Sequence, residues 1–455
     1  MKVWIKYLLG IALGIVASFL LPFDNIKVKE AFIFLTDLFI RVGRYIVVPL
    51  IFSTAICSIN KLRSSKMLLK ISGWTFSIII LSSLLLTIVG ITSILIIKLP
   101  RIPITVDVPS EVTQINIKQM ILSLFPSSGF QAVNEGSFLL VCLVMAFIIG
   151  WESSANEILF KPVFALADAC SKLFSDIAVF FTEIMSVFCV AIMAYWFVQF
   201  RDIVEPGIYT PMILMFVCDF VIVAGLIYPL ILRFLCHDPH PYRVLFASIA
   251  PAILSFISGD SNLVIPLSMR HGGESLGIRR RCRGFTYPLF SIFARGGSAL
   301  VTTISFVLIW RSYSSLSLPV SDILWIFGIS FGLSFLLGGF PSGGAFILLT
   351  IMCNKYAKGF ETSFLLLQPA SLIICSFASL FDTVTAMFGS YIVAVKTKLI
   401  EHHSITHFIL FFFRHFASQN RCVPCFRYRF ILPFRFAPLQ NACGGTPYTL
   451  PGLNK

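Results

Sequence analysis

Charged residues are scarce in this chain of 455 residues. Asp, Glu, Lys and Arg make up 12% of it and hydrophobic residues 57%, whereas a soluble domain carries about 25% charged residues. This shortage excludes an ordinary soluble protein. The alternation of a membrane-spanning β-strand is also missing, and the apolar runs are too long for such strands. The composition therefore predicts an all-α polytopic membrane protein.

Acidic residues are scarcer than basic ones, with 21 Asp and Glu against 35 Lys and Arg and a net charge of +14. A basic balance can indicate nucleic-acid binding, but here the cations lie in short loops between apolar runs, as the positive-inside rule describes. We therefore expect no nucleic-acid partner. No small-residue cleavage site follows the first apolar run, which ends at Phe23, so we interpret this run as an uncleaved span.

Cysteines with the spacing of a disulfide framework or a zinc site are nearly absent. Most of the twelve are single residues inside apolar spans, where they serve as small packing residues; examples are Cys57, Cys142, Cys189, Cys218 and Cys375. One Cys-x-x-Cys motif, Cys422–Cys425, lacks a following His pair at zinc-finger spacing. We expect no cofactor, no enzyme activity and no metal site other than one for Na⁺.

Long apolar runs dominate what is present. Eight segments are predicted to cross the bilayer: roughly 4–23, 31–59, 71–97, 137–151, 177–200, 208–235, 285–310 and 364–395. The N-terminal boundaries of the fourth and fifth spans are not sharply defined. The stretch 153–176 is expected to form interfacial helices or a tilted extension. Two further apolar segments, 245–269 and 323–352, are interrupted.

The second interrupted segment contains the run Gly338-Gly339-Phe340-Pro341-Ser342-Gly343-Gly344. Neither apolar piece beside it reaches the roughly 20 residues that a crossing helix needs. A break at membrane depth leaves backbone polar groups without helical partners, which is tolerated only where they line a cavity or bind something. Residues 258–262 interrupt the first segment in the same way. Both segments therefore predict re-entrant helical hairpins.

The charges of the loops predict from which side of the membrane each hairpin enters. The loop after the second span carries Lys61, Arg63, Lys66 and Lys70 without an acid, and the loop 270–283 carries five Arg against one Glu. Both loops belong in the cytoplasm, which requires the first hairpin to enter and leave on that side. The second hairpin then enters from outside. The resulting order, hairpin–span–hairpin–span, is an inverted repeat typical of secondary transporters.

The composition changes after Glu401. Residues 402–455 contain six Lys and Arg and no Asp or Glu. We predict a membrane domain over 1–403 and a basic aromatic tail over 404–455, either disordered or lying on the anionic inner leaflet. A tail translated in a shifted reading frame is the other interpretation.

Four charges lie deep in apolar segments: Asp219, Asp260, Arg295 and Asp382. Each costs roughly 2.5–3.5 kcal/mol on insertion and is a functional candidate for that reason. Structural roles compete: Asp260 as a cap for Leu263–Met269, and Arg295 in an ion pair with Asp260 or Asp382. For Asp219 the structural alternatives are a pair with a nearby Arg and a position near an interface. Two breaks, near Arg295 and Asp382, together with two hairpin tips would gather carboxylates and carbonyls for Na⁺, and a guanidinium for a carboxylate.

An enzyme is the alternative class. Asp219 and Asp260 on successive segments resemble the dyad of intramembrane aspartyl proteases, and Ser258-Gly259-Asp260 partly matches their Gly-x-Gly-Asp motif. Ile257 stands where the first glycine belongs, and the motif lies in a predicted hairpin. The protease interpretation is therefore disfavoured.

Several short segments follow one another in a recognisable order: Thr36–Arg41 and Val48–Phe52, Pro266–Arg270, Thr286–Leu289, Gly338–Ala345 and Ile392–Ala394. Over about residues 5–400 the chain resembles the dicarboxylate/amino acid:cation symporter family, which has the glutamate-transporter fold. This resemblance implies eight transmembrane helices with two re-entrant hairpins. It also implies a homotrimer in a bacterial inner membrane, with both termini in the cytoplasm.

The chain departs from that family where the family binds its ligands. The family's seventh-span Asn-Met-Asp-Gly-Thr is replaced by Ala294–Ser298, which removes two Na⁺-linked side chains and introduces Arg295. Alignment on Ile392–Ala394 places Asp382 at a cation-binding Asn. Small residues stand where the family has a substrate-binding Asp, a substrate-binding Arg and a cation-binding Asp, at Cys375, Ala378 and Ala386.

The resemblance implies alternating-access symport of a small anionic or zwitterionic solute bearing a carboxylate, an amino acid or dicarboxylate, with Na⁺ or H⁺. The implied substrate-binding residues are Asp260, Ser261, Asn262, Arg295, Ser298, Pro341, Ser342, Gly343 and Thr385. Those implied for the cation are Gly296, Asp382 and Thr383, and those for the outer gate are Gly338, Gly339, Gly343 and Gly344.

The resemblance also divides the membrane domain. It implies a scaffold over about 1–70 and 120–205, and a moving transport region over about 71–100 and 206–400 that carries the hairpins 245–269 and 323–352. Because the acidic ligands in the seventh and eighth spans are lost, a second function stays open. The chain is then a degenerate family member that acts as an uncoupled anion channel or a solute sensor.

Overall fold

The computed structural model describes residues 3–23, 25–103, 139–155, 157–314, 318–340, 343–356 and 359–401. Our predictions for the tail 404–455 and for Pro341 and Ser342 lie outside the described residues. Within them, the regular structure is helical apart from one isolated bridge between Ile278 and Ile400.

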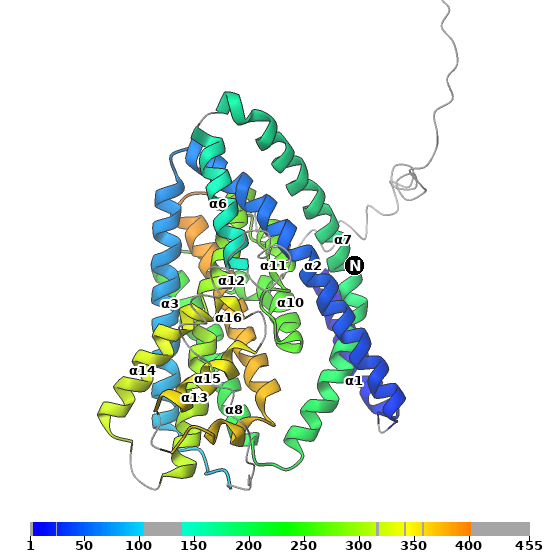
Figure 1. The fold of residues 1–455 in the computed structure, drawn as a ribbon, viewed down its shortest axis with the longest axis vertical. Coiled ribbons are helices and arrows are strands. Elements are labelled where there is room, and N and C mark those ends of the chain that lie inside the picture. Colours follow the sequence, from blue (N-terminus) through cyan, green and yellow to red (C-terminus); the bar gives the residue numbers. More distant parts are fainter. Residues whose placement is uncertain are drawn as a thin grey trace, which may run out of the picture. The chain divides into compact units, whose positions relative to one another are not determined.

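Helices make up most of the described chain (Figure 1). They are α1 (Val3–Leu20), α2 (Ile26–Ser64), α3 (Leu68–Ile96), α6 (Leu139–Ala155), α7 (Glu157–Val204), α8 (Thr210–Phe220), the π-helix η1 (Val221–Ile227), α9 (Tyr228–Leu235), α10 (Tyr242–Ser258), α11 (Ile265–Glu274), α12 (Arg280–Phe293), α13 (Gly296–Tyr313), α14 (Val320–Ser334), the 3₁₀-helix η2 (Phe335–Gly339), α15 (Gly344–Tyr356), the 3₁₀-helix η3 (Ser363–Leu367) and α16 (Ser371–Lys396).

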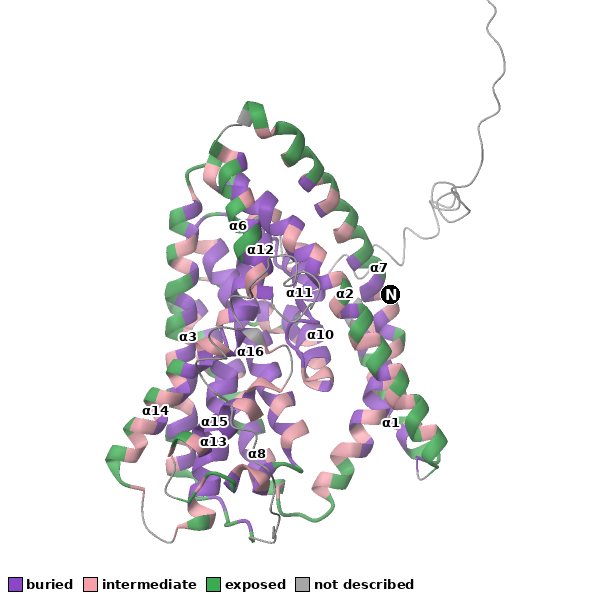
Figure 2. Ribbon diagram, viewed as in Figure 1, coloured by how far each residue is buried: buried purple, intermediate pink, exposed green. Residues whose placement is uncertain are grey.

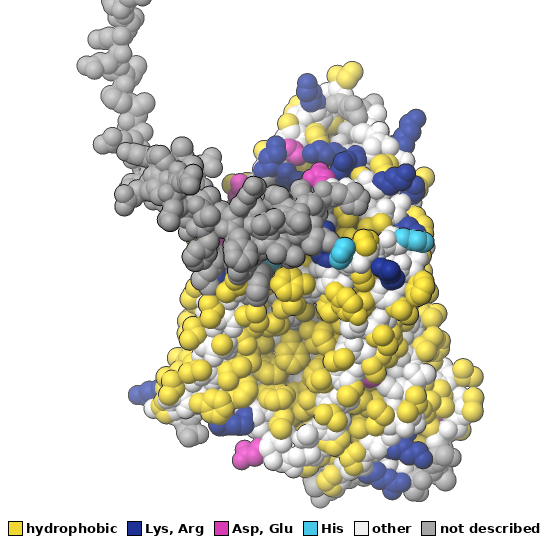
Figure 3. Space-filling view, turned by 180° about the vertical axis from the view of Figure 1, so that it is seen from behind, with side chains coloured by type: hydrophobic (Ala, Val, Ile, Leu, Met, Phe, Trp, Pro, Cys, Tyr) yellow, Lys and Arg dark blue, Asp and Glu magenta, His cyan; other side chains and the backbone are white. Residues whose placement is uncertain are grey.

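Long apolar helices identify a membrane protein. Seven helical stretches of the described chain are long and apolar enough to cross a bilayer. Figure 3 shows the matching surface, with a hydrophobic band between two ends that carry Lys and Arg. The polytopic helical fold is thereby confirmed. The count of eight spans stays a prediction, because α1 and α6 belong to the shorter apolar helices and Val320–Gly338 to the long ones.

Burial divides the helices into a central and a peripheral set (Figure 2). The most apolar windows of α12–α13 and α16 are 94% and 89% buried, against 28–67% for the other long helices. The polar centre of the molecule therefore lies on helices that are surrounded by protein, where unpaired backbone groups are tolerated.

Two helix–break–helix units are present where hairpins were predicted. In the first, which we call hairpin 1, α10 ends at Gly259 in the left-handed conformation (φ +64°), and α11 starts again at Ile265. In hairpin 2, α14 continues into η2, and α15 begins at Gly344. Gly343 has φ +76°, a backbone conformation that favours glycine. Figure 1 shows hairpin 2 in the lower half of the view.

Only one of the two predicted breaks in the crossing helices exists. Ala294 and Arg295 separate α12 from α13, as predicted. The break predicted near Asp382 is wrong, because α16 runs without interruption. No Gly or Pro lies beside Asp382, and Thr385 Oγ1 donates to the Phe381 carbonyl within the helix (2.7 Å), a contact that α-helices accommodate.

The fifth span, whose start is poorly defined in the sequence, belongs to one continuous helix. α7 contains 48 residues and includes the charged stretch that precedes residue 177. This stretch is therefore an extension of the span, the second of the two arrangements that we considered.

Candidate solute and cation site

A small cavity lies where hairpin 1, hairpin 2, α13 and α16 meet. Its volume is about 10 Å³, which is room for roughly one water molecule. A dicarboxylate or amino acid is several times larger, so binding one requires the lining elements to move apart. The lining residues are Gly259, Arg295, Ser298, Gly343, Gly344, Ala345, Cys375, Ala378 and Ser379.

Arg295 is the one cation among the residues that line this cavity. It is 4% exposed, and it is the last residue of the break, directly before α13. Nη1 donates to Ser261 Oγ (2.6 Å) and Nη2 to Asn262 Oδ1 (3.3 Å), both on the tip of hairpin 1. Its buried Nε has no hydrogen-bond partner among the described residues. One donor of this buried guanidinium is therefore unpaired within the described part of the chain.

Asp382 closes the other side of this arrangement. Its Oδ2 lies 3.8 Å from Arg295 Nη1 and accepts a hydrogen bond from Ser298 Oγ (2.9 Å). Its Oδ1 accepts from the backbone N–H groups of Gly297 (2.8 Å) and Ser298 (3.3 Å). A carboxylate of α16 thus caps the positive N-terminal end of α13. Gly297 permits this approach, because a Cβ there would lie 2.8 Å from Asp382 Oδ1.

The oxygens predicted to hold a cation are already engaged. Both Asp382 oxygens accept protein donors, and Thr383 Oγ1 donates to Ser255 Oγ (2.7 Å). Carboxylate and hydroxyl oxygens are suitable ligands for Na⁺, but Na⁺ at Asp382 would have to displace Ser298 or compete with Arg295. The described residues contain no cluster of three or more Asp, Glu, His or Cys that could hold a metal.

Asp260 faces a different neighbour. Its Oδ2 accepts from Arg44 Nε on α2 (2.9 Å). Its Oδ1 accepts from the backbone of Asn262 (2.8 Å) and Leu263 (3.4 Å). It is fully buried and holds the turn that precedes α11. Ser261 and Asn262 lie toward Arg295, whereas the carboxylate of Asp260 lies toward α2.

The remaining residues predicted for the site also fall into those that line the cavity and those that do not. Thr385 Oγ1 bonds to the Tyr228 hydroxyl (2.6 Å) on α9 and does not line the cavity. Gly296 is buried where α13 begins. A Cβ on Gly338 would lie 2.8 Å from the Ile292 carbonyl, so this glycine lets η2 lie against the end of α12. Gly339 ends η2, and Gly343 and Gly344 line the cavity.

Asp219 and Asp260 have different partners, which does not support a protease dyad. Asp219 Oδ2 accepts from Ser93 Oγ on α3 (3.0 Å), whereas Asp260 pairs with Arg44. Two catalytic carboxylates have to share a site within hydrogen-bond distance, and no such contact occurs among the described residues.

A larger pocket adjoins the cavity. We call it the outer pocket, because the loop charges predict that it faces outside. It has a volume of about 730 Å³ and shares Gly259, Gly343 and Cys375 with the cavity. Lys29 of α2 and Asp202 of α7 also line it. The tips of the two hairpins thus border a space large enough for a small solute.

Sequence reasoning missed three contributors: Arg44, Ser379 and Ser255. Arg44 is a charge within a long apolar helix, and the cost of burying charge was a signal that could have found it. Ser255 donates to the Ser379 carbonyl (2.8 Å) and joins hairpin 1 to α16. A single serine inside an apolar helix is too common to be singled out without the structure.

Comparison with known proteins gives one positive result. No curated protein matches the chain. The model of the sodium:dicarboxylate symporter family matches residues 3–397, which confirms the suspected family. Its members are membrane transporters, not enzymes, and in general carry dicarboxylates or amino acids together with Na⁺. Because the match covers most of the chain and nearly all described residues, this protein belongs to the sodium:dicarboxylate symporter family.

Proposed function

We propose that this protein is a secondary active transporter that carries a small carboxylate-bearing solute together with Na⁺ or H⁺. The observation that carries the proposal is the buried guanidinium of Arg295, which lines the cavity between the two hairpin tips and has a free Nε. A guanidinium in a water-poor site binds a carboxylate strongly and with fixed geometry. Substrate contacts would come from Arg295, Ser298, Ser261, Asn262 and hairpin 2.

An acidic amino acid is not the preferred solute. The residues that line the cavity include no carboxylate to receive an ammonium group, and Asp382 is engaged by α13 and Arg295. A solute with one or two carboxylates and no amino group fits this charge pattern best. An unpaired ammonium in a buried site would be costly.

Alternating access supplies the transport step in this proposal. The cavity is too small for the solute, and it adjoins the outer pocket at Gly259 and Gly343. Displacement of hairpin 2 about its glycines would admit the solute, and its return would close the site. Residues 338–344 would then act as the outer gate. Asp260 and Thr385 would support the site without contacting the solute.

The coupling ion would act at Asp382. Na⁺ would bind Asp382 with the neighbouring oxygens of Gly296 and Thr383 after displacing a protein donor. A proton would instead neutralise the carboxylate and release Arg295 for the solute. Either ion would link its own binding to that of the solute through the same guanidinium.

The proposal includes the finer architecture that the family implies: eight spans, two hairpins, and a homotrimer in a bacterial inner membrane with cytoplasmic termini. The scaffold would comprise residues 1–70 and 120–205, and the moving region residues 71–100 and 206–400. Contacts between α2 and α7 are consistent with a scaffold built around these two helices.

Uptake into proteoliposomes tests the proposal. Purified protein is given labelled succinate, malate, aspartate or glutamate under an inward Na⁺ gradient, an inward H⁺ gradient or none. We expect gradient-dependent uptake of a dicarboxylate, and a fall of roughly tenfold or more in Arg295→Ala, the scale of a lost buried ionic contact. Arg311→Ala, at the other end of α13 and away from the cavity, is the matched control.

Two outcomes would contradict the proposal. Uptake or current that ignores both gradients would favour the uncoupled channel. Equal losses in Arg295→Ala and Arg311→Ala would show that Arg295 acts on the fold and not on the solute.

A further inference from the structure

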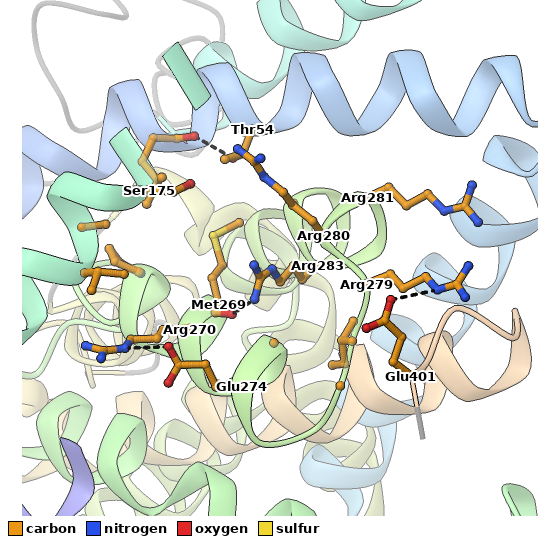
Figure 4. A pocket seen from close by; sticks show the side chains of 18 of the residues that line it. Thr54, Ser175, Met269, Arg270, Glu274, Arg279, Arg280, Arg281, Arg283 and Glu401 are labelled. Carbon is orange, nitrogen blue, oxygen red and sulfur yellow. Dashed lines mark hydrogen bonds and ion pairs between the residues drawn. The ribbon is translucent and has the colours of Figure 1, made fainter. Parts of the chain in front are cut away.

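A second pocket lies at the opposite end of hairpin 1, and we call it the basic pocket. It has a volume of about 640 Å³ and lies between α2, α7, α11 and α12, at the end that the loop charges predict to be cytoplasmic (Figure 4). The transport function proposed above uses the other end of hairpin 1, which is its tip. The charged lining residues are Lys61, Arg270, Glu274, Arg279, Arg280, Arg281, Arg283 and Glu401.

The charges of the basic pocket do not balance. Six cations face two carboxylates, which leaves a net charge of +4. Three cations have acidic partners: Lys61 pairs with Asp168 (3.0 Å), Arg270 with Glu183 (2.9 Å) and Arg279 with Glu401 (3.5 Å). The other three, all on the first turn of α12, form no ion pair within the described part of the chain; they are Arg280, Arg281 and Arg283.

Neutral contacts use only part of the hydrogen-bonding capacity of these three arginines. Arg280 Nη2 donates to Ser171 Oγ (2.8 Å), and Arg283 Nη1 donates to the Met269 carbonyl (3.0 Å). Each guanidinium has five N–H donors. In Figure 4 the side chains of Arg280 and Arg283 extend to one side and those of Arg279 and Arg281 to the opposite side. Arg280 and Arg283 thus bring free donors to the same side of the pocket.

The position of these arginines is unfavourable for the isolated helix. The N-terminal end of a helix is positive, and cations there are destabilising. The first turn of α12 has no acidic residue, and Arg279 provides no side-chain cap. A local conflict of this kind indicates a functional requirement or a missing partner. A bound anion would relieve both the helix end and the three guanidiniums.

A general preference for cytoplasmic cations does not account for this arrangement. That preference is satisfied by exposed residues such as Lys66, between α2 and α3, and Lys70, on the first turn of α3. It does not require three arginines that form no ion pair within the described part of the chain to line one pocket. The tail cannot supply the missing charge either, because the chain after Glu401 contains no Asp or Glu.

We propose that the basic pocket binds a phosphate group through Arg280 and Arg283, with Arg281 adding positive charge at the same helix end. Guanidiniums match the geometry of phosphate oxygens with paired N–H donors. The phosphate belongs either to an anionic phospholipid of the inner leaflet or to a soluble phosphate compound, since both present the same oxygens. Because the pocket joins α2 and α7 to hairpin 1, its occupancy holds these elements together.

Thermal unfolding in nanodiscs tests the proposal, because a ligand that binds the folded state raises its stability. The full chain is placed in nanodiscs of phosphatidylcholine alone, of phosphatidylcholine with phosphatidylglycerol, or of phosphatidylcholine with added inorganic phosphate. We expect a higher unfolding midpoint in at least one of the last two conditions. Stabilisation by the lipid alone identifies a headgroup site, and stabilisation by inorganic phosphate identifies a soluble ligand.

The double variant Arg280→Gln/Arg281→Gln should lose this shift. It leaves Arg283 and its contact with Met269 intact, so that hairpin 1 keeps its support. Lys66→Gln/Lys70→Gln removes the same charge from the same predicted side and should keep the shift. The proposal is overturned if neither phosphate source stabilises the native chain, or if both double variants lose the shift equally, which would show general surface attraction.

Discussion

Arg295 and Asp382 form a buried pair whose members are 5% and 3% exposed. Removing one member of such a pair is much more damaging than removing both, because the remaining charge is left in a water-poor site. Asp382 also accepts the N–H groups that begin α13. The energetic role of this pair is therefore separable from its proposed role in binding the solute.

We predict that Asp382→Ala lowers the free energy of unfolding by about 3–5 kcal/mol. Arg295 then lacks its counter-charge, and two backbone donors lose their acceptor. Arg295→Met in the same chain should restore part of the loss, since no buried charge remains. Thermal unfolding of the two single variants and the double variant in detergent gives the coupling energy. Strictly additive effects would contradict the pairing.

At this scale the sequence identified the charges but not all of their partners. Burial cost singled out Asp260, Arg295 and Asp382, and the ion pair between Arg295 and Asp382 was one of the arrangements considered. The pairing of Asp260 with Arg44 joins residues far apart in the chain. Such a choice depends on how hairpin 1 lies against α2, which no local pattern encodes.

Among the elements, breaks signalled by glycine were predictable and the break near Asp382 was not. Gly259 and Gly343 occupy backbone conformations with positive φ, so their positions follow from residue type. The prediction of a break near Asp382 rested on the polar run Asp382–Thr385 in the middle of an apolar span; a buried carboxylate does need donors. The donors come instead from the end of α13, which leaves the backbone of α16 intact. A charge thus shows that partners are required, but not which element provides them.

The packing of α13 on α16 depends on Gly297. A Cβ there would lie 2.3 Å from the Phe381 Cβ and 2.9 Å from the Ala378 carbonyl. We predict that Gly297→Ala destabilises the protein by about 1–3 kcal/mol, as overpacking does, and lowers solute uptake by shifting Asp382. Unfolding midpoints and proteoliposome uptake measure the two effects.

Gly328→Ala on α14 is the matched control. A Cβ on Gly328 would meet no atom within 4 Å, and alanine favours the helix over glycine. This variant should be as stable as the native chain or slightly more stable. A similar loss in both variants would mean that helix flexibility, rather than the approach of α13 to α16, is what Gly297 provides.

For the whole molecule, loop charge alone predicts an order of hairpins and spans. The charges of the loops around 61–70 and 270–283 require hairpin 1 to return to its own side; the helix–break–helix unit α10–α11 is present, and its side of the membrane stays a prediction. The way in which the hairpins contact α2 and α7 was beyond the sequence. If the proposed scaffold and moving region exist, those contacts lie between them.

One such contact joins Arg44 of α2 to Asp260 at the tip of hairpin 1. Gly43 lies at the same crossing, where a Cβ would come within 2.1 Å of the Leu263 Cδ1. If α2 belongs to a scaffold and hairpin 1 to a moving region, this ion pair favours the arrangement in which the outer pocket adjoins the cavity. Weakening it should then shift the population away from that arrangement.

The reactivity of Cys375 reports this shift, because Cys375 lines both the cavity and the outer pocket. We predict that Arg44→Gln slows the labelling of Cys375 by a membrane-impermeant maleimide added from outside by roughly fivefold or more, the scale of a typical coupling energy. Mass spectrometry of the Cys375 peptide separates it from the other cysteines. Arg41→Gln, an exposed charge one turn away on α2, should leave the rate unchanged.

The double variant Arg44→Gln/Asp260→Asn should also be labelled slowly, since it lacks the same ion pair without leaving a buried charge. Native labelling rates in that double variant would mean that the pair stabilises the hairpin tip alone and does not bias the motion.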